Sequence, residues 1–331
     1  MFVVQDLGIA IGLCVVTMLG WGSWANTQKL AGKDRWPFQL YYWDYALGVL
    51  VLGVVLLLTL GSVGASGMSG IANLAQADAP SIGWALLSGA LFNVSNILLV
   101  VAIDAAGMSV AFPVGVGLAL VIGTVVSYAQ TPQGSPGLLF GGVALVVFAM
   151  IMSAMAYSKL PRKGEQSWTR GVLFAVLAGS LMGTFYPQLM RAISPDFNSA
   201  SIEPGKLTPY AALVLFGVGL VASNIIANTV FMRAAGLSYS DYFRGSARLH
   251  SLGLLGGVIW MLALSANVIA SGVAGPAVSY ALGQGATLVA AVWGVLIWRE
   301  FRGAPKGATA LVVSMFAGYT VGLALIGMAT L

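Results

Sequence analysis

Four asparagines inside long apolar runs are the first side chains of this sequence that could bind a ligand. Asn93 and Asn96 lie in one run, and Asn224 and Asn228 lie in another, where a spacing of four places both on one helix face. Buried amides either hold helices together by hydrogen bonds or line a cavity, and both interpretations stay open. Because an amide donates and accepts, an amide-lined cavity suits a solute with hydroxyl or ureido groups.

Aromatic side chains form a second group of candidates. Their flat faces suit the C–H face of a sugar or a planar heterocycle. Trp260 lies near the middle of its apolar run, where the usual role of tryptophan at a membrane interface fits poorly. The aromatic candidates for a substrate-binding site are Trp21, Trp43, Tyr186, Trp260 and Tyr280. The tryptophans that we assign to interfacial positions are Trp24, Trp36, Trp168 and Trp298.

Asp44 is the acidic side chain with the clearest chemical potential, because it lies one turn inside an apolar run. A carboxyl that is partly buried beside a cavity can exchange a proton at physiological pH. We therefore hypothesise that Asp44 couples proton entry to solute entry. The alternative is a salt bridge to Arg35, Arg244 or Arg248.

The sequence offers little for catalysis. Its single histidine, His250, excludes a multi-histidine metal site, and its single cysteine, Cys14, excludes a disulfide within one chain and a cysteine metal cluster. A Ser/His/Asp set is also missing. We expect no enzyme activity, no bound metal and no cofactor.

The composition predicts that these side chains are held in a membrane. Of 331 residues, 59% are hydrophobic and 8% are charged, and the mean hydropathy is +0.92. A soluble domain of this size could not bury so much apolar surface. The 43 glycines suit close helix packing in lipid. The net charge of +5 comes from short loops, where basic residues set topology, so we expect no nucleic-acid partner.

Mainly apolar runs of about 20 residues, the length of a membrane-spanning helix, occur ten times. They are continuous and lack the two-residue alternation of a β-barrel. The sequence therefore predicts an all-α integral membrane protein with ten transmembrane helices. The expected spans are 7–25, 41–61, 82–103, 107–128, 137–157, 171–193, 208–232, 247–265, 274–298 and 307–329.

A helix hairpin with a glycine-rich second arm occurs twice, 168 positions apart, so that Gly89 falls on Gly257 and Gly107 on Gly275. An odd number of spans in each half reverses the orientation of the second half. We therefore predict two inverted five-helix repeats, an arrangement typical of transporters. The expected parts are a first repeat at 1–157, a cytoplasmic linker at 158–170 and a second repeat at 171–331.

Polarity differs between the two repeats in the second arm of the hairpin. Tyr280 and Gln284 correspond to Phe112 and Val116, so polar groups occur in one repeat only, as an asymmetric cavity requires. Gln284 and Gln188 complete the substrate-binding candidates.

Lysine and arginine are distributed unequally between the predicted loops. Thirteen of them fall on one side of the membrane, and only Arg191 and Lys206 fall on the other. Lys29 and Lys33 are two of the thirteen and lie in the first predicted loop. Because basic loops stay in the cytoplasm, we predict a multi-pass protein of the plasma (inner) membrane with both termini outside. One chain with both repeats forms a complete path, so a monomer surrounded by lipid is sufficient.

Prolines inside two spans mark places where helices could bend. Pro113 and Pro187 each remove a backbone hydrogen bond, and we expect kinks there that serve alternating access. Arg244, in the polar stretch before the eighth span, is the third gate candidate, whereas we assign Arg248 to positive-inside anchoring. We expect Glu300 to pair with neighbouring arginines in a structural role.

Four stretches of the chain together resemble a known family. They are Gly20-Trp21-Gly22-Ser23-Trp24 at the end of the first span, Tyr42-Trp43-Asp44-Tyr45, the paired hairpins 88–128 and 256–298, and the segment from Trp293-Gly294 to Arg299-Glu300-Phe301-Arg302. The chain is similar to the drug/metabolite transporter superfamily, in the branch that holds bacterial glucose/ribose porters and plant ureide permeases. Two features depart from that pattern. The first hairpin ends in Tyr128-Ala129-Gln130 without an acid, and the short central loop lacks a nucleotide-binding glycine motif, which argues against a direct role for ATP.

The resemblance implies a secondary active transporter that takes up a small neutral polar solute by alternating access. We expect a monosaccharide, carried by proton symport through Asp44, because the departures remove central-loop features of the plant pattern. The alternative is a ureide or nucleobase permease. A multidrug exporter is a third interpretation, and it would need a buried acid, for which Asp44 is the one serviceable candidate.

Overall fold

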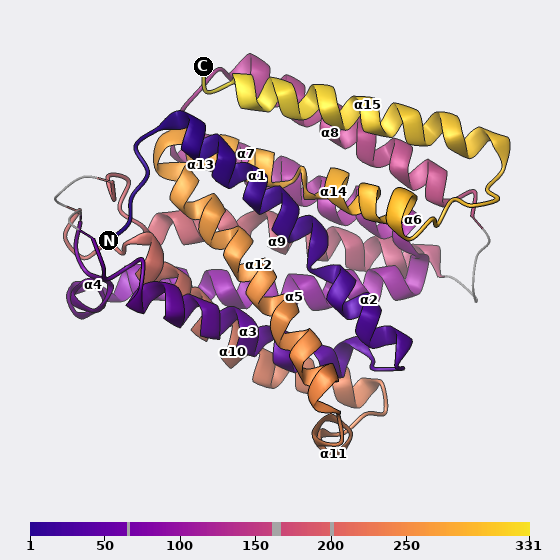
Figure 1. Ribbon diagram of the computed structural model, residues 1–331, viewed down its shortest axis with the longest axis horizontal. Coiled ribbons are helices and arrows are strands. Elements are labelled where there is room, and N and C mark those ends of the chain that lie inside the picture. The colour runs from indigo at the N-terminus through magenta and orange to yellow at the C-terminus, as the bar shows by residue number, and fades with distance from the viewer. Residues whose placement is uncertain (65–66, 161–166, 199–201) are drawn as a thin grey trace.

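The computed structural model describes residues 1–64, 67–160, 167–198 and 202–331, and these form a bundle of helices (Figure 1). Ten helices in this part of the chain are long and apolar enough to cross a membrane, which confirms the prediction of an all-α integral membrane protein. In chain order the elements are α1 (Leu7–Ser23), α2 (Ala25–Lys33), α3 (Phe38–Leu58), α4 (Gly70–Gln76), α5 (Ala79–Ala106), α6 (Met108–Ala111), η1 (Phe112–Val116), α7 (Gly117–Gln130), α8 (Pro136–Tyr157), α9 (Trp168–Ala192), α10 (Pro209–Ala234), α11 (Tyr239–Phe243), α12 (Ala247–Ala274), α13 (Pro276–Gly283), α14 (Ala286–Val292), η2 (Trp293–Ile297) and α15 (Lys306–Met328).

The first span is longer than the sequence suggested. The Trp24 N–H still donates to the Gly20 carbonyl, so the chain continues from α1 into α2 with only a slight break. Lys29 and Lys33, which we expected in a loop, therefore lie on the helix α2, and that expectation was wrong. A helix of nine mainly polar residues is too short to give a pattern that can be recognised from sequence.

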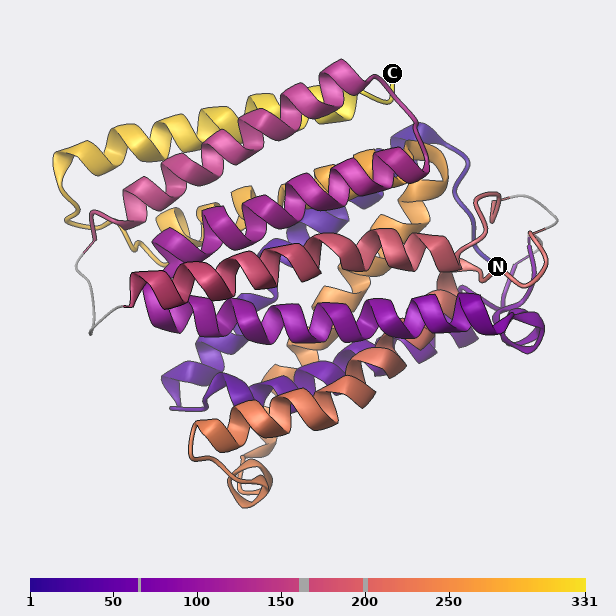
Figure 2. The same cartoon turned by 180° about the vertical axis from the view of Figure 1, so that it is seen from behind.

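The helices at the centre of the bundle pack in matching pairs. α5 packs against α9 and α10, and α12 packs against α1 and α3. α5 and α12 each contain 28 residues and begin 168 positions apart, and each ends at a glycine with φ 79°, Gly107 and Gly275. α8 and α15 lie side by side at one edge of the bundle (Figures 1 and 2). The two-repeat division of the chain stays a prediction.

The helix ends gather in two groups, which we call the basic end and the termini end. At the termini end, the Asp78 N–H donates to Gly205 and the Ser135 N–H to Ala329, and both chain ends lie there (Figures 1 and 2). The basic end carries Lys29, Lys33, Arg35, Lys159, Arg170, Arg233, Arg244, Arg248, Arg299, Arg302 and Lys306 of the described residues. Arg162 and Lys163, two of the thirteen basic residues, lie outside the described residues.

Two glycines of the repeated hairpin allow helix backbones to touch. A Cβ atom on Gly89 would lie 2.0 Å from the Phe216 carbonyl oxygen of α10, and one on Gly257 would lie 2.0 Å from the Tyr45 carbonyl oxygen of α3. Side chains at these positions would push α5 and α12 away from their neighbours. The glycines therefore set the close packing at the centre of the bundle.

We expect Gly257→Ala to lower the free energy of unfolding by about 1–3 kcal/mol, because the methyl group overpacks a backbone contact. The measurement is thermal unfolding of the purified protein in detergent. Gly83→Ala on α5 is the matched control, because nothing lies within 4 Å of its Cβ position. Equal stability of the two variants would contradict the packing role of Gly257.

Candidate functional site

A cavity of about 180 Å³ lies between α1, α2, α5, η1, α9, α12, α14 and the end of α13, and we call it the central cavity. Its walls include four of the side chains predicted from sequence, Trp21, Asn96, Trp260 and Gln284. The volume is below the roughly 300–1,000 Å³ of pockets for drug-sized ligands, so its occupant must be small. The remaining residues that line it are Gly22, Trp24, Ala25, Phe92, Leu99, Val116, Met182, Phe185, Ala286 and Ala290.

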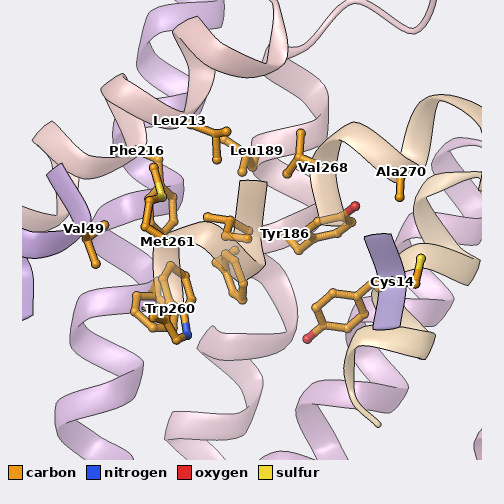
Figure 3. Packing of buried hydrophobic residues seen from close by; sticks show 14 of the residues in the cluster. Cys14, Val49, Tyr186, Leu189, Leu213, Phe216, Trp260, Met261, Val268 and Ala270 are labelled. Carbon is orange, nitrogen blue, oxygen red and sulfur yellow. The ribbon is translucent and has the colours of Figure 1, made fainter. Parts of the chain in front are cut away.

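Trp260 is the centre of an aromatic cluster beside this cavity. Its ring lies 4.1 Å from that of Phe92, 5.7 Å from that of Phe216 and 5.9 Å from that of Trp21, measured between ring centroids. Figure 3 shows Trp260 packed among buried side chains, with Phe216 and Met261 beside it. The Trp21 and Trp260 rings are inclined by only 23°. Flat, nearly parallel surfaces of this kind suit a planar solute.

Polar atoms of the cavity walls lack partners. Neither the Trp21 indole N–H nor the Asn96 amide nitrogen has a hydrogen-bond partner among the described residues, although both are buried. A buried donor without a partner costs about 1–3 kcal/mol. Two such donors in the wall of one cavity are the feature expected of a site whose ligand supplies the missing acceptors.

The other asparagines form a polar layer between α3, α5 and α10. Tyr42 approaches Asn96 from α3, and Asn93 donates to the Ser223 hydroxyl at 2.9 Å. Asn228 donates to the Gln39 carbonyl at 2.9 Å, whereas neither polar atom of the Asn224 side chain has a partner in the described part of the chain. These contacts agree with interhelical hydrogen bonding for Asn93 and Asn228, while Asn96 lines the cavity.

The remaining substrate-binding candidates lie away from the cavity walls. Tyr186 stacks on Tyr280 at 5.0 Å and shares a hydrogen bond of 3.0 Å with Ser279, so this pair joins α9 to α13. The Tyr280 hydroxyl donates to the Ala119 carbonyl of α7 at 3.3 Å. Gln188 lies on α9 with its carbonyl oxygen unpaired among the described residues. Trp43 packs against Tyr239 at 5.6 Å, on the side of α11.

Asp44 is buried and joins three helices at the basic end. One carboxylate oxygen accepts a hydrogen bond of 2.7 Å from the Tyr242 hydroxyl of α11, and the other lies 2.8 Å from His250 Nδ1 of α12. Burial, and then the hydrogen bond to Asp44, raise the pKa of Tyr242 and keep it protonated as the donor. The alternative of a salt bridge to Arg35, Arg244 or Arg248 was wrong, because tertiary packing brings the one histidine of the chain to Asp44 first.

Other charged side chains of the basic end also have partners that the sequence did not indicate. Arg248 pairs with Asp34, with side chains 66% and 42% exposed. Glu300 pairs with Lys29 at 2.6 Å and accepts a hydrogen bond of 2.8 Å from Tyr157. The expectation of an arginine partner for Glu300 was wrong, because α2 carries Lys29 to the turn after η2.

The three gate candidates lie in different settings. Pro113 lies in the π-helical turn η1, where a proline cannot donate the usual helix hydrogen bond. Pro187 lies inside the continuous helix α9, and Arg244 is an exposed residue at the C-terminal cap of α11. Their roles in gating stay predictions.

Sequence reasoning missed several cavity residues. Trp24, which we placed at the membrane interface, lines the cavity and packs against Tyr45 at 5.0 Å. Trp36 is buried against His250, so its assignment to the interface was also wrong. Phe92 could have been found, because it lies four residues before Asn96 and shares its helix face.

The ten apolar helices around a polar-aromatic cavity define the class of this protein: a multi-pass membrane protein. A solved crystal structure has the same fold, with a TM-score of 0.59 and 15% identity over 96% of this chain and 95% of its own. The profile of the ureide permease family matches residues 41–166 and 162–330, and the chain belongs to this family. Members of the family are transporters and not enzymes.

Two of the relatives resemble the chain over nearly its whole length. Ureide permease 1 and ureide permease 4 of Arabidopsis thaliana are each 22% identical to it, over 98% of both chains. Ureide permease 3 of the same plant is 26% identical over 70% of this chain and 74% of its own. These relatives do not support the monosaccharide that we expected, and the alternative of a ureide permease fits them better.

Proposed function

We propose that this protein transports a small, neutral, ureide-type solute, a ureide or a nucleobase, through the central cavity by alternating access. The observation that carries the proposal is the pair of unpartnered donors, Trp21 Nε1 and Asn96 Nδ2, in the wall of an aromatic cavity of about 180 Å³. A ureido group is planar and carries a carbonyl oxygen, which accepts hydrogen bonds from such donors. The names of the Arabidopsis relatives support the same solute class.

The cavity chemistry favours a planar solute over a sugar or an organic cation. The unpartnered donors Trp21 Nε1 and Asn96 Nδ2 match the carbonyl oxygens of a ureide or a nucleobase better than the hydroxyl groups of a sugar. A multidrug exporter for cations would need an acid in the cavity, but the Asp44 carboxylate is held by Tyr242 and His250 and does not line it. We therefore do not retain the exporter interpretation.

Alternating access would use the two halves of the chain as inverted repeats with opposite orientations. The matched packing of α5 and α12, and their glycine ends at Gly107 and Gly275, support this division. The excess of basic residues at one end favours a cytoplasmic location for it, with both termini outside. A monomer in the plasma membrane is sufficient for this path.

Proton coupling would act through Asp44. Tyr45, the next residue on α3, packs against Trp24 of the cavity wall at 5.0 Å, so a movement of α3 affects both sites. Protonation of Asp44 would remove the charge that holds His250 and would loosen α3 from α12. The groups that face Asp44 are His250, Tyr242 and the nearby Tyr41.

The test is uptake into proteoliposomes of radiolabelled allantoin, uracil, glucose and ribose. We expect saturable uptake of allantoin or uracil, and we expect glucose and ribose at a large excess to leave it unchanged, because their hydroxyl groups do not supply the planar carbonyl acceptors that match the Trp21 and Asn96 donors. Empty vesicles are the control. Sugar uptake without allantoin or uracil uptake would overturn the proposed solute class.

A further inference from the structure

A second chamber of about 170 Å³ adjoins the central cavity on the side of the basic end. It lies between α1 and α2 on one side and α8, α14, η2 and α15 on the other. Gly22, Ala25 and Ala290 line both spaces, so only small side chains separate them. The two chambers are nearly equal in volume, so the second is large enough for the same small solute.

A hydrogen-bonded ion pair lies in the wall of this chamber. Lys29 Nζ is 2.6 Å from Glu300 Oε1, and the Tyr157 hydroxyl donates to Glu300 Oε2 at 2.8 Å. The side chains of Lys29 and Glu300 are 40% and 31% exposed, so the pair faces solvent on one side and the chamber on the other. The contact joins α2 to the turn after η2 and to the end of α8.

The backbone next to Glu300 departs from a regular α-helix. The Trp298 N–H donates to the Trp293 carbonyl, which is the wider spacing of a π-helical turn, and Arg299 has a φ of 53°. A Cβ atom on Gly294 would lie 2.7 Å from the Tyr157 hydroxyl oxygen and 2.9 Å from Glu300 Oε2. Glycine at this position allows Glu300 to reach Tyr157.

We infer that this chamber is a second ureide-binding station on the path between the central cavity and the basic end, closed by the Lys29–Glu300 pair. The inference rests on the proposed function. A half-exposed ion pair contributes at most about 1 kcal/mol, so it can open at little cost. Two ureido N–H groups match the two oxygens of a carboxylate, and a ureido carbonyl accepts from an ammonium group. The passing solute thus takes the place of Lys29 as the donor to Glu300, and of Glu300 as the acceptor from Lys29.

The single buried cysteine makes a labelling experiment direct. Cys14 is only 1% exposed, so a methanethiosulfonate reagent does not reach it. The reagent therefore labels a cysteine that is introduced by Ser153→Cys in the second chamber or by Ala286→Cys in the central cavity. We expect allantoin to slow the labelling of both introduced thiols. Glu300→Gln should weaken the protection at position 153 about tenfold and leave the protection at position 286 unchanged, because it removes one charged acceptor.

The outcomes separate the inference from the proposed function. Protection at position 286 without protection at position 153 would overturn the second station alone. Protection at position 153 that is unchanged by Glu300→Gln would also overturn it, because the effect would then come from a conformational change. If neither allantoin nor uracil protects either thiol, the proposed solute class is wrong. Asp34→Asn, at the exposed Asp34–Arg248 pair of the same end, is the matched control and should change neither protection.

Discussion

Asn96→Leu is expected to lower kcat/KM for the uptake of a ureide by about 10- to 100-fold. The amide nitrogen of Asn96 is buried in the cavity wall without a partner among the described residues, so it is available to a solute carbonyl. The leucine has a similar shape but no donor, and the solute group that enters the cavity then stays unpaired. Initial rates of allantoin uptake at several concentrations measure the effect.

The same substitution should leave the free energy of unfolding within about 1 kcal/mol of the wild type, because leucine keeps the volume of Asn96 and the amide nitrogen, which Tyr42 approaches, has no well-formed hydrogen bond among the described residues. Asn73→Leu is the matched control. Asn73 is also buried, but its side chain accepts a hydrogen bond of 2.8 Å from the Thr208 N–H and donates one of 3.0 Å to the Lys206 carbonyl. Both contacts lie at the termini end, away from the central cavity. The Asn73→Leu protein should be less stable than the wild type and should have an unchanged KM for the ureide. Normal uptake by a folded Asn96→Leu protein would remove Asn96 from the site.

Asp44→Asn is expected to abolish accumulation of solute against its gradient while leaving exchange of labelled for unlabelled solute in place. An amide cannot take up a proton in the way that a carboxylate does, so the step that links the proton gradient to the movement of α3 is lost. The substitution leaves the residues that line the central cavity, Asn96 and Trp260 among them, unchanged, so solute binding and exchange should continue. Accumulation under an inward proton gradient and counterflow without a gradient measure the two properties.

Two further variants show whether the effect comes from the titrating group. Tyr242→Phe removes the hydrogen bond to Asp44 but keeps the carboxylate, and it should reduce the rate while preserving accumulation. Asp34→Asn changes an exposed acid that pairs with Arg248 at the same end, and it should have no measurable effect. Full accumulation by Asp44→Asn would end the coupling role of this residue.

The sequence was sufficient to predict the membrane class, the ten spans and the distribution of basic residues. These features depend on continuous apolar runs and on loop charges, which act locally along the chain. Asn96, Trp21, Trp260 and Gln284 could be selected for the same reason, because a polar or large aromatic group inside an apolar run is costly without a purpose. The predicted spans differ from the observed helices chiefly at two ends: the first span continues through α2 to Lys33, and the eighth, predicted to end at 265, continues as α12 to Ala274.

Only the tertiary structure decided which of these side chains meet. Asn93 and Asn96 have the same residue type and lie one turn apart on α5, yet Asn93 bonds to Ser223 whereas Asn96 lines the cavity. Asp44 lies next to His250, and Glu300 next to Lys29, across 206 and 271 positions of sequence. A single sequence carries no information on such distances, because they follow from how helices cross at glycines such as Gly89 and Gly257. The sequence thus determined which groups the membrane would contain, and the packing of the helices determined which of them face one cavity.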